Sequence, residues 1–160
     1  MTLASSPPEY AVRLALPGDL AAVASCRRRW ATEGRPGAAE PDDGDFERRM
    51  EQWWTQEASR RVTWLAWSGT HAIGMAAAVV FHRMPSPGRA TARWAYVSQV
   101  WVDAALLRLG VSTDLMGAVL SWSQAEGMVR LVLNPSDAAR TLYGRLGFRP
   151  ADDLLRLDLG

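Results

Sequence analysis

Three strand-like segments follow one another between residues 61 and 103, and short connections join them. Their sequences are RVTWLAWS (61–68), HAIGMAAAVVFHR (71–83) and ARWAYVSQVWVD (92–103). Gly69 and Thr70 between the first two suit a tight hairpin, and a loop that contains proline and glycine separates the last two. Neighbouring strands joined in this way pair in antiparallel orientation, so the middle of the chain is predicted to form a meander.

After residue 103 the pattern changes to helix alternating with strand. We expect a helix over 113–126, an apolar strand over 129–134 (VRLVLN), a helix over 137–146 and a last strand over 154–159 (LLRLDL). Strand, helix and strand in this order form a crossover unit with parallel strands. The C-terminal third therefore predicts parallel pairing beside the antiparallel meander.

The segment before the meander predicts one strand and two helices. Residues 10–16 alternate as a strand does, Pro17 and Gly18 turn the chain, and Asp19 is expected to be the N-cap of the first helix. The apolar stripes of the two helices are Leu20, Val23, Ala24, Arg27 and Trp30, and then Phe46, Met50, Trp53 and Trp54. We expect a disordered head over 1–9, a loop over 34–44, and a single domain over 10–160.

Charge and composition exclude several classes of protein. The 160 residues have a formal net charge of +1 and all 18 basic residues are arginine, so no surface for nucleic acid or an acidic membrane is expected. The sequence lacks a signal peptide pattern, and no apolar run approaches the roughly 18 residues of a membrane span, which predicts a cytoplasmic protein. The single cysteine, Cys26, predicts a buried apolar side chain, and no metal site is expected.

The loop LRLGVSTDLM, residues 107–116, precedes the helix of the crossover unit. Free backbone N–H groups at such a helix start, with about half a positive charge from the helix dipole, can hold an anion. Gly110 allows the main chain to approach a ligand, and Ser112 and Thr113 offer hydroxyl donors. Alternatively, Ser112 or Thr113 only caps the helix and Gly110 only shapes the turn. The spacing by itself leaves both interpretations open.

Two motifs together resemble those of the GNAT superfamily, the acyl-CoA-dependent N-acetyltransferases. In VWVDAALLRLGVSTDLM, Val100 to Val102 match a Val-x-Val strand end, and Gly110 matches the first glycine of a Gln/Arg-x-x-Gly-x-Gly/Ala loop. In AARTLYGRLGF, an Ala-x-x-x-Tyr-x-x-x-Gly-Phe helix is matched by Ala139, Tyr143, Gly147 and Phe148. The order of the predicted elements over residues 10–159 also looks like that of the family.

The resemblance implies an α/β fold with a GNAT-like mixed, mostly antiparallel sheet of about six to seven strands, about four flanking helices, and a splay between the fourth and fifth strands. It implies acetyl-CoA, or another acyl-CoA, as cofactor. The main chain of Val100, Trp101 and Val102 would pair with pantetheine, although Val100 and Val102 also fit ordinary core packing. The other implied cofactor contacts are Leu107, Arg108, Leu109, Gly110, Val111, Ser112, Thr113, Asn134, Ser136, Ala139 and Tyr143.

The phosphate loop departs from the family pattern. Leu107 stands where the family has Gln or Arg, and Ser112 stands where it has the last glycine or alanine. Asp114 brings a carboxylate into the first helical turn, which suits the helix dipole but would repel a pyrophosphate if it pointed inward. We therefore expect weakened phosphate binding, with Arg108, Arg140 or Arg145 as candidates for compensating charge. Asn134 and Ser136 have an alternative role as caps of the helix that starts near Asp137.

Tyr143 is the expected catalytic residue. Acyl transfer from a thioester to an amine expels a thiolate, which a nearby phenol can protonate. The alternative is a buried aromatic side chain on the helix face of Ala139 and Leu146, and the resemblance favours the catalytic role.

No general base is identified by the sequence, although a base must take a proton from the acceptor ammonium before attack. The strand YVSQVWV carries Ser98 and Gln99 where the family sometimes has glutamate. The remaining candidates are Asp103, Glu33, Glu51, His71 and His82. Trp30, Trp53 and Trp54 are candidates for acceptor binding, whereas aromatic stripes at helical spacing more often form core.

The leading hypothesis is an enzyme that transfers an acetyl or other short acyl group from acyl-CoA to a primary amine of a small molecule or peptide, by direct attack in a ternary complex. The alternative is a catalytically impaired acyl-CoA-binding or regulatory module with the same fold. Residues 154–159 offer an edge strand through which a homodimer can form.

Overall fold

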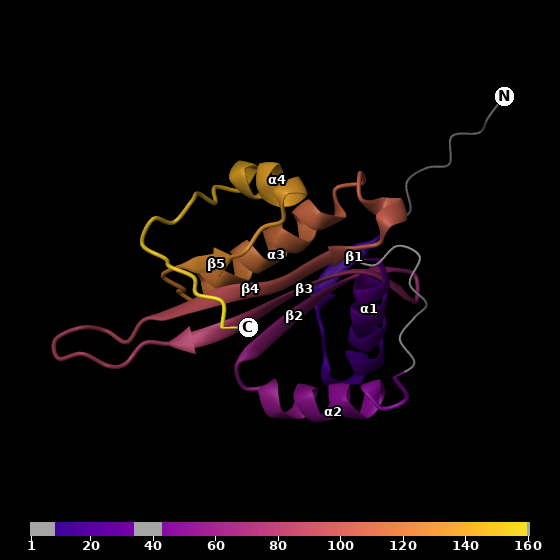
Figure 1. Cartoon of the computed structure of the whole chain (residues 1–160), viewed down its shortest axis with the longest axis horizontal. Coiled ribbons are helices and arrows are strands. Elements are labelled where there is room, and N and C mark those ends of the chain that lie inside the picture. Colours follow the sequence, from indigo (N-terminus) through magenta and orange to yellow (C-terminus); the bar gives the residue numbers. More distant parts are fainter. Residues whose placement is uncertain (1–8, 34–42, 160) are drawn as a thin grey trace.

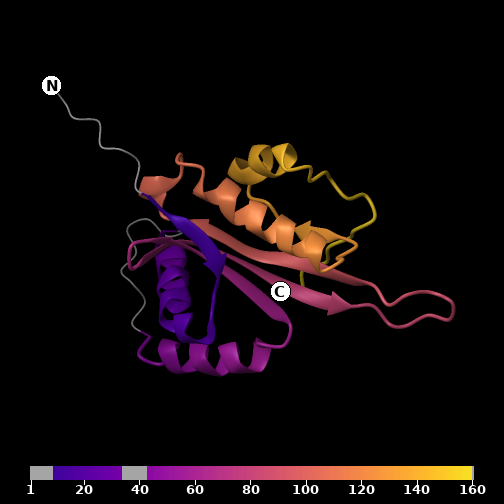
Figure 2. The same ribbon diagram turned by 180° about the vertical axis from the view of Figure 1, so that it is seen from behind.

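The computed structural model describes residues 9–33 and 43–159. A five-stranded sheet lies between two layers of helices, with α3 and α4 over one face and α1 and α2 over the other (Figures 1 and 2). Most of the expected disordered head (1–9) and of the expected loop (34–44) falls outside the described residues.

The strands follow the sheet in chain order, β1-β2-β3-β4-β5. β1 to β4 pair antiparallel and β4 pairs parallel with β5, so the predicted meander and the predicted crossover are both confirmed. The hairpin between β2 and β3 closes over Gly69 and Thr70, as the sequence predicts. The strands are β1 (Ala11–Leu14), β2 (Arg61–Ser68), β3 (His71–His82), β4 (Arg93–Val102) and β5 (Leu131–Leu133).

The sheet has five strands, so the expectation of six to seven strands is wrong. The segment over 154–159 alternates as a strand does, but it has no strand pairing within the described residues. Its apolar side chains face solvent, and Leu155 is 100% exposed. A strand needs a neighbouring edge as well as an alternating pattern, and β5 is only three residues long. An ion pair between Arg130 and Asp153, at 3.2 Å, holds the chain near the start of β5 before this segment begins.

The helices are α1 (Leu20–Glu33), α2 (Phe46–Glu57), α3 (Val111–Ala125) and α4 (Arg140–Arg145), and short 3₁₀ turns precede α1, α3 and α4. The prediction that Asp19 caps α1 is wrong, because Asp19 lies in the 3₁₀ turn before the helix. Its carboxylate instead accepts hydrogen bonds from the Leu16 backbone, at 2.7 Å, and from the Arg13 guanidinium, at 2.6 Å. These bonds lower the pKa of Asp19 to about 2 and tie the end of β1 to the start of α1.

The two faces of the sheet build two separate clusters of apolar side chains. Trp64 on β2 packs with Val111 and Leu115 of α3, whereas the next residue, Leu65, packs with Val23 of α1. This alternation follows from the two-residue period of a strand, which sends neighbouring side chains to opposite faces. Cys26 is buried in the second cluster, as predicted. Among the described residues, none of the helices has the length and apolar character that a membrane span requires.

Gly74 lies on β3 where a side chain has no room. A Cβ at this position would lie 3.1 Å from Leu115 Cδ1, 3.1 Å from the Trp101 carbonyl oxygen and 3.2 Å from Val102 Cγ2.

We expect Gly74→Ala to lower the free energy of unfolding by about 1–3 kcal/mol, because one obstacle is rigid backbone. Gly117→Ala in α3, where a Cβ has nothing within 4 Å, should be neutral or stabilise by up to about 1 kcal/mol. Denaturant unfolding of the two variants measures this; equal stability would show that β3 and α3 can separate at Gly74.

Candidate functional site

β4 and β5 separate at a β-bulge. Ser98 is the extra residue, because Ala77 on β3 pairs with Gln99 and Ala78 pairs with Val97. The parallel pairing of β4 with β5 ends at the same level, at Val97 and Leu133. Beyond this level, the described residues include no strand partner for the β5-facing edge of β4, so its backbone groups can pair with a ligand. The predicted splay between the fourth and fifth strands is therefore present.

Val100, Trp101 and Val102 are the last three residues of β4, beyond the bulge. Val100 and Val102 pack on the α3 side, as the core interpretation predicts. Trp101 faces α1, where its indole Nε1 donates a 2.7 Å hydrogen bond to Glu33 and the Arg29 guanidinium lies 4.7 Å from its ring centroid. The side chains of these three residues thus pack on the two faces of the sheet. Only the backbone groups on the β5-facing edge of β4 are left to bind a ligand.

The start of α3 lies next to the open edge of β4 in the chain. Gly110 is the N-cap and has a φ of 85°, a left-handed conformation that favours glycine. No side chain caps this terminus, and Ser112 and Thr113 lie inside the helix. The interpretation in which Ser112 or Thr113 caps the helix is therefore wrong. Backbone N–H groups of the first turn remain available for an anion.

Asp114 of this turn is held by Tyr10, a residue that the sequence did not indicate. The Tyr10 hydroxyl donates a 2.5 Å hydrogen bond to the Asp114 carboxylate, and a Cβ at Gly110 would lie 3.9 Å from that hydroxyl. This bond is the largest cause that raises the pKa of Tyr10 to about 12. It fastens the chain just before β1 to the loop before α3. Arg108 of this loop is exposed, as are Leu107 and Leu109.

Asn134 and Ser136 follow β5 on the other side of the splay, and both are exposed. Ser136 precedes the 3₁₀ turn at Asp137–Ala139, but its side chain makes no capping hydrogen bond there. Arg140 is paired with Asp137 at 3.1 Å, which reduces its value as a compensating charge for a phosphate.

Tyr143 is held on α4 by the motif that also contains Gly147 and Phe148. Gly147, with a φ of 92°, ends the helix in a Schellman motif in which the Phe148 N–H donates to the Tyr143 carbonyl at 3.0 Å. The rings of Tyr143 and Phe148 meet edge to face at 5.7 Å between centroids. Tyr143 is 9% exposed, and burial raises the pKa of its phenol. Its hydroxyl makes no hydrogen bond within residues 9–33 and 43–159, so it is an available donor.

A cavity of about 540 Å³ lies on the other face of the sheet, under α1 and α2, and we call it the α1/α2 groove. Its helical wall consists of Val23, Arg27, Phe46, Arg49, Met50 and Trp53. Its floor on the sheet consists of Arg61, Thr63, Met75, Ala77, Ser98 and Gln99. The groove therefore reaches β4 at the bulge, directly where β4 leaves β5.

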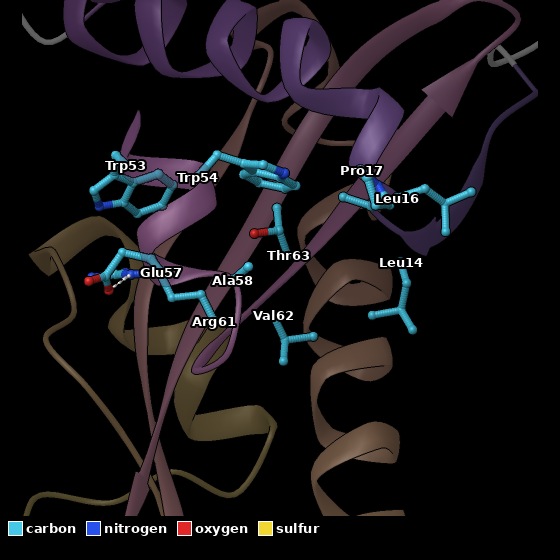
Figure 3. Close-up of a pocket in the computed structure, with 11 residues that line it drawn as sticks. Leu14, Leu16, Pro17, Trp53, Trp54, Glu57, Ala58, Arg61, Val62 and Thr63 are labelled. Carbon is cyan, nitrogen blue, oxygen red and sulfur yellow. Dashed lines mark hydrogen bonds and ion pairs between the residues drawn. The ribbon is translucent and has the colours of Figure 1, made fainter. Parts of the chain in front are cut away.

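A second cavity, of about 310 Å³, lies between the end of α2 and the loop before α1 (Figure 3). Trp53 lines both cavities, Trp54 lines only this second one, and Trp30 lines neither. Glu57 and Arg61 form an ion pair at 2.7 Å beside the indole of Trp53 (Figure 3). Of the three tryptophans proposed for acceptor binding, the structure thus brings only Trp53 to the α1/α2 groove.

The candidate bases lie outside the groove. Glu33 accepts from Trp101, and Asp103 forms an ion pair with Arg29. Glu51, His71 and His82 are exposed at other positions. Among the described residues that line the α1/α2 groove, none is acidic and none is histidine. The charged residues there are arginines, and the sequence does not indicate them as site residues because their helix and strand positions fit an ordinary amphipathic surface.

Comparison with known proteins identifies the family to which the chain belongs. The model of the acetyltransferase (GNAT) family matches residues 24–148. The chain belongs to the GNAT acetyltransferase family. A comparison with curated protein sequences gives no match.

Solved GNAT structures share the fold. A predicted acetyltransferase from Clostridium acetobutylicum, solved with acetyl-CoA, has a TM-score of 0.75 at 20% identity, over 94% of this chain and 97% of that chain. An aminoglycoside N-acetyltransferase in complex with CoA has a TM-score of 0.70 at 17% identity, over 98% of both chains. An aminoglycoside acetyltransferase from an uncultured soil metagenomic sample, in complex with sisomicin, has a TM-score of 0.69 at 14% identity, over 94% and 95%. At these identities the likeness shows the GNAT fold.

The Tyr10–Asp114 hydrogen bond makes the stability of this GNAT chain depend on pH in the alkaline range. The folded-state pKa of Tyr10 is raised from 10.0 to about 12, so the bond stabilises fully below pH 10 and is lost as the pH rises towards 12. We expect the free energy of unfolding to fall less steeply between pH 10 and 12 in Tyr10→Phe than in the wild type. Tyr96→Phe is the control, because Tyr96 makes no side-chain hydrogen bond within the described part of the chain. Parallel pH profiles of Tyr10→Phe and the wild type would contradict the expectation.

Proposed function

We propose that this protein is an N-acyltransferase that moves an acetyl or other short acyl group from acyl-CoA to a primary amine by direct attack in a ternary complex. One observation carries the proposal. The α1/α2 groove meets β4 at the bulge, at the level where the pairing of β4 with β5 ends. Two ligands can then approach one point of β4 from opposite sides, the cofactor along the splay and the acceptor through the groove.

In this proposal the open edge of β4 at Val100 to Val102 binds the pantetheine amides as an added strand would. The loop before α3 and the first turn of α3, from Leu107 to Thr113, bind the pyrophosphate through backbone N–H groups. Asn134, Ser136 and Ala139 face the cofactor from beyond β5. The CoA-bound structures among the similar proteins support this choice of cofactor, because they share the fold.

Tyr143 supplies the proton in the transfer step. The amine nitrogen forms a bond to the acyl carbon, the carbon–sulfur bond breaks, and the departing thiolate takes the phenolic proton. The proton lost by the amine passes to solvent, and solvent restores the phenol. A phenol is protonated at neutral pH, and burial raises the pKa of Tyr143 further; its hydroxyl, unpaired among the described residues, and its ring contact with Phe148 suit a positioned donor.

A second function, an acyl-CoA-binding module without efficient catalysis, is favoured by Asp114. This carboxylate lies in the first turn of α3, where a pyrophosphate would bind, and Leu107 offers no polar side chain in the loop. The absence of an acid or histidine among the described groove residues points the same way. The two functions differ in turnover and share cofactor binding.

Calorimetry with acetyl-CoA and thiol release across a panel of primary amines test the proposal. We expect binding, amine-dependent thiol release, and a loss of turnover of about tenfold or more in Tyr143→Phe with cofactor affinity nearly kept. Tyr96→Phe, which changes a tyrosine on β4 away from the splay's open edge, should retain wild-type turnover. Unchanged turnover in Tyr143→Phe would remove the phenol from the mechanism. Binding without thiol release would favour the module, and no binding at millimolar acetyl-CoA would reject both functions.

A further inference from the structure

The α1/α2 groove has an unusual charge for a site that receives an amine. Three arginines line it, Arg27, Arg49 and Arg61, and the described lining residues include no acid. A guanidinium without a carboxylate partner attracts an anion and repels an ammonium group. The groove therefore suits an acceptor that also carries a negative charge.

Two of the three arginines have carboxylate partners. Arg61 is paired with Glu57 at 2.7 Å, and Arg49 is paired with Asp43. Arg27 has no acidic partner within residues 9–33 and 43–159. Its guanidinium donates a 2.9 Å hydrogen bond to Gln99 Oε1 and lies 4.1 Å from the ring centroid of Trp30. Arg27 is half-buried, and burial lowers the pKa of its guanidinium.

Gln99 completes the feature at the β4 bulge. Because Arg27 donates to its Oε1 atom, the amide Nε2 of Gln99 is left as a donor. That Nε2 atom is buried and has no hydrogen-bond partner among the described residues. A buried donor without a partner destabilises the folded protein, so a ligand oxygen that reached this amide would remove that cost. Arg27 and Gln99 thus place a guanidinium without an acidic partner in the described residues next to an unpartnered amide donor, within the lining of the groove.

Most of the remaining lining is apolar. Phe46, Met50 and Trp53 of α2 and Met75 of β3 line the same groove, and Thr63 and Ser98 add two hydroxyl groups. A cavity of about 540 Å³ is within the size range of small-molecule sites, which are lined mainly by apolar side chains with a few polar groups.

We propose that the acceptor is a small primary amine that carries a carboxylate and an apolar side chain, in the manner of an apolar amino acid, with the carboxylate bound by Arg27 and the Gln99 amide. This inference rests on the proposed N-acyltransferase function and names its substrate class. The apolar side chain of the acceptor packs against Phe46, Met50 and Trp53.

A matched pair of acceptors tests the carboxylate. L-Phenylalanine and L-phenylalaninamide differ only in that group, and sisomicin serves as a polycationic probe. We expect kcat/KM for thiol release from acetyl-CoA to be at least about tenfold higher with phenylalanine than with its amide, because a charge-assisted hydrogen bond is lost in the amide. Sisomicin should be the poorest of the three. Equal or better turnover of the amide or of sisomicin would overturn the carboxylate assignment and leave the N-acyltransferase function in place.

Calorimetric titration of the same ligands without acetyl-CoA tests the carboxylate site independently of the transferase function. Selective binding of phenylalanine over its amide, with no thiol release from any acceptor, would support the carboxylate site and reject the transferase function. Equal binding of both ligands would count against the site.

Arg27→Gln tests the residue that carries the proposal. We expect KM for phenylalanine to rise at least about tenfold, with little change for the amide, and Arg27→Lys to recover part of the difference. Arg83→Gln removes the same charge from an exposed position after β3 and should leave both acceptors unchanged. Thermal unfolding confirms that each variant is folded. An equal loss for both acceptors in Arg27→Gln would show a structural role and reject the assignment.

Discussion

The end of hydrogen bonding between β4 and β5 is the constraint on which the site depends. The bulge at Ser98 and the last parallel pair, Val97 with Leu133, occur at one level of the sheet. A regular β4 paired along its whole length would leave no main-chain edge for a ligand. The uncapped start of α3 follows this open edge directly in the chain, so in the proposed function the strand end and the helix start both contact the cofactor.

The sheet also separates two chemical environments. On the α3 and α4 side, Tyr143 is buried among apolar side chains, and its raised pKa follows from the loss of water around the phenol. On the α1 and α2 side, the groove is charged, and one guanidinium, that of Arg27, lacks a carboxylate partner in the described residues. Gln99 belongs to β4 and lines that groove. The strand with the open edge therefore also provides the amide that accepts from Arg27 on the α1 and α2 side.

Several features of the site could be predicted from local sequence because local rules govern them. The left-handed φ of Gly110 and the Schellman motif of Gly147 need glycine, and neighbouring residues provide their hydrogen bonds. The same locality explains the errors. Ser112 and Thr113 are good capping residues in general, but the helix starts one residue before Ser112, and residues 154–159 have the pattern of a strand without an edge to pair with. Tyr10 could not be linked to Asp114, because 104 residues separate them.

The sequence by itself determined the order of strands and helices, the antiparallel meander, the parallel crossover and the two motifs of the GNAT family. These follow from periodicity, turn residues and short spacings, all of which involve residues close together in the sequence. Only the tertiary structure decided the number of strands in the sheet, the end of pairing at Ser98, and the meeting of Arg27 with Gln99 across 72 residues. Such features depend on which distant segments pack together, and packing is decided by the whole set of contacts instead of by any local pattern.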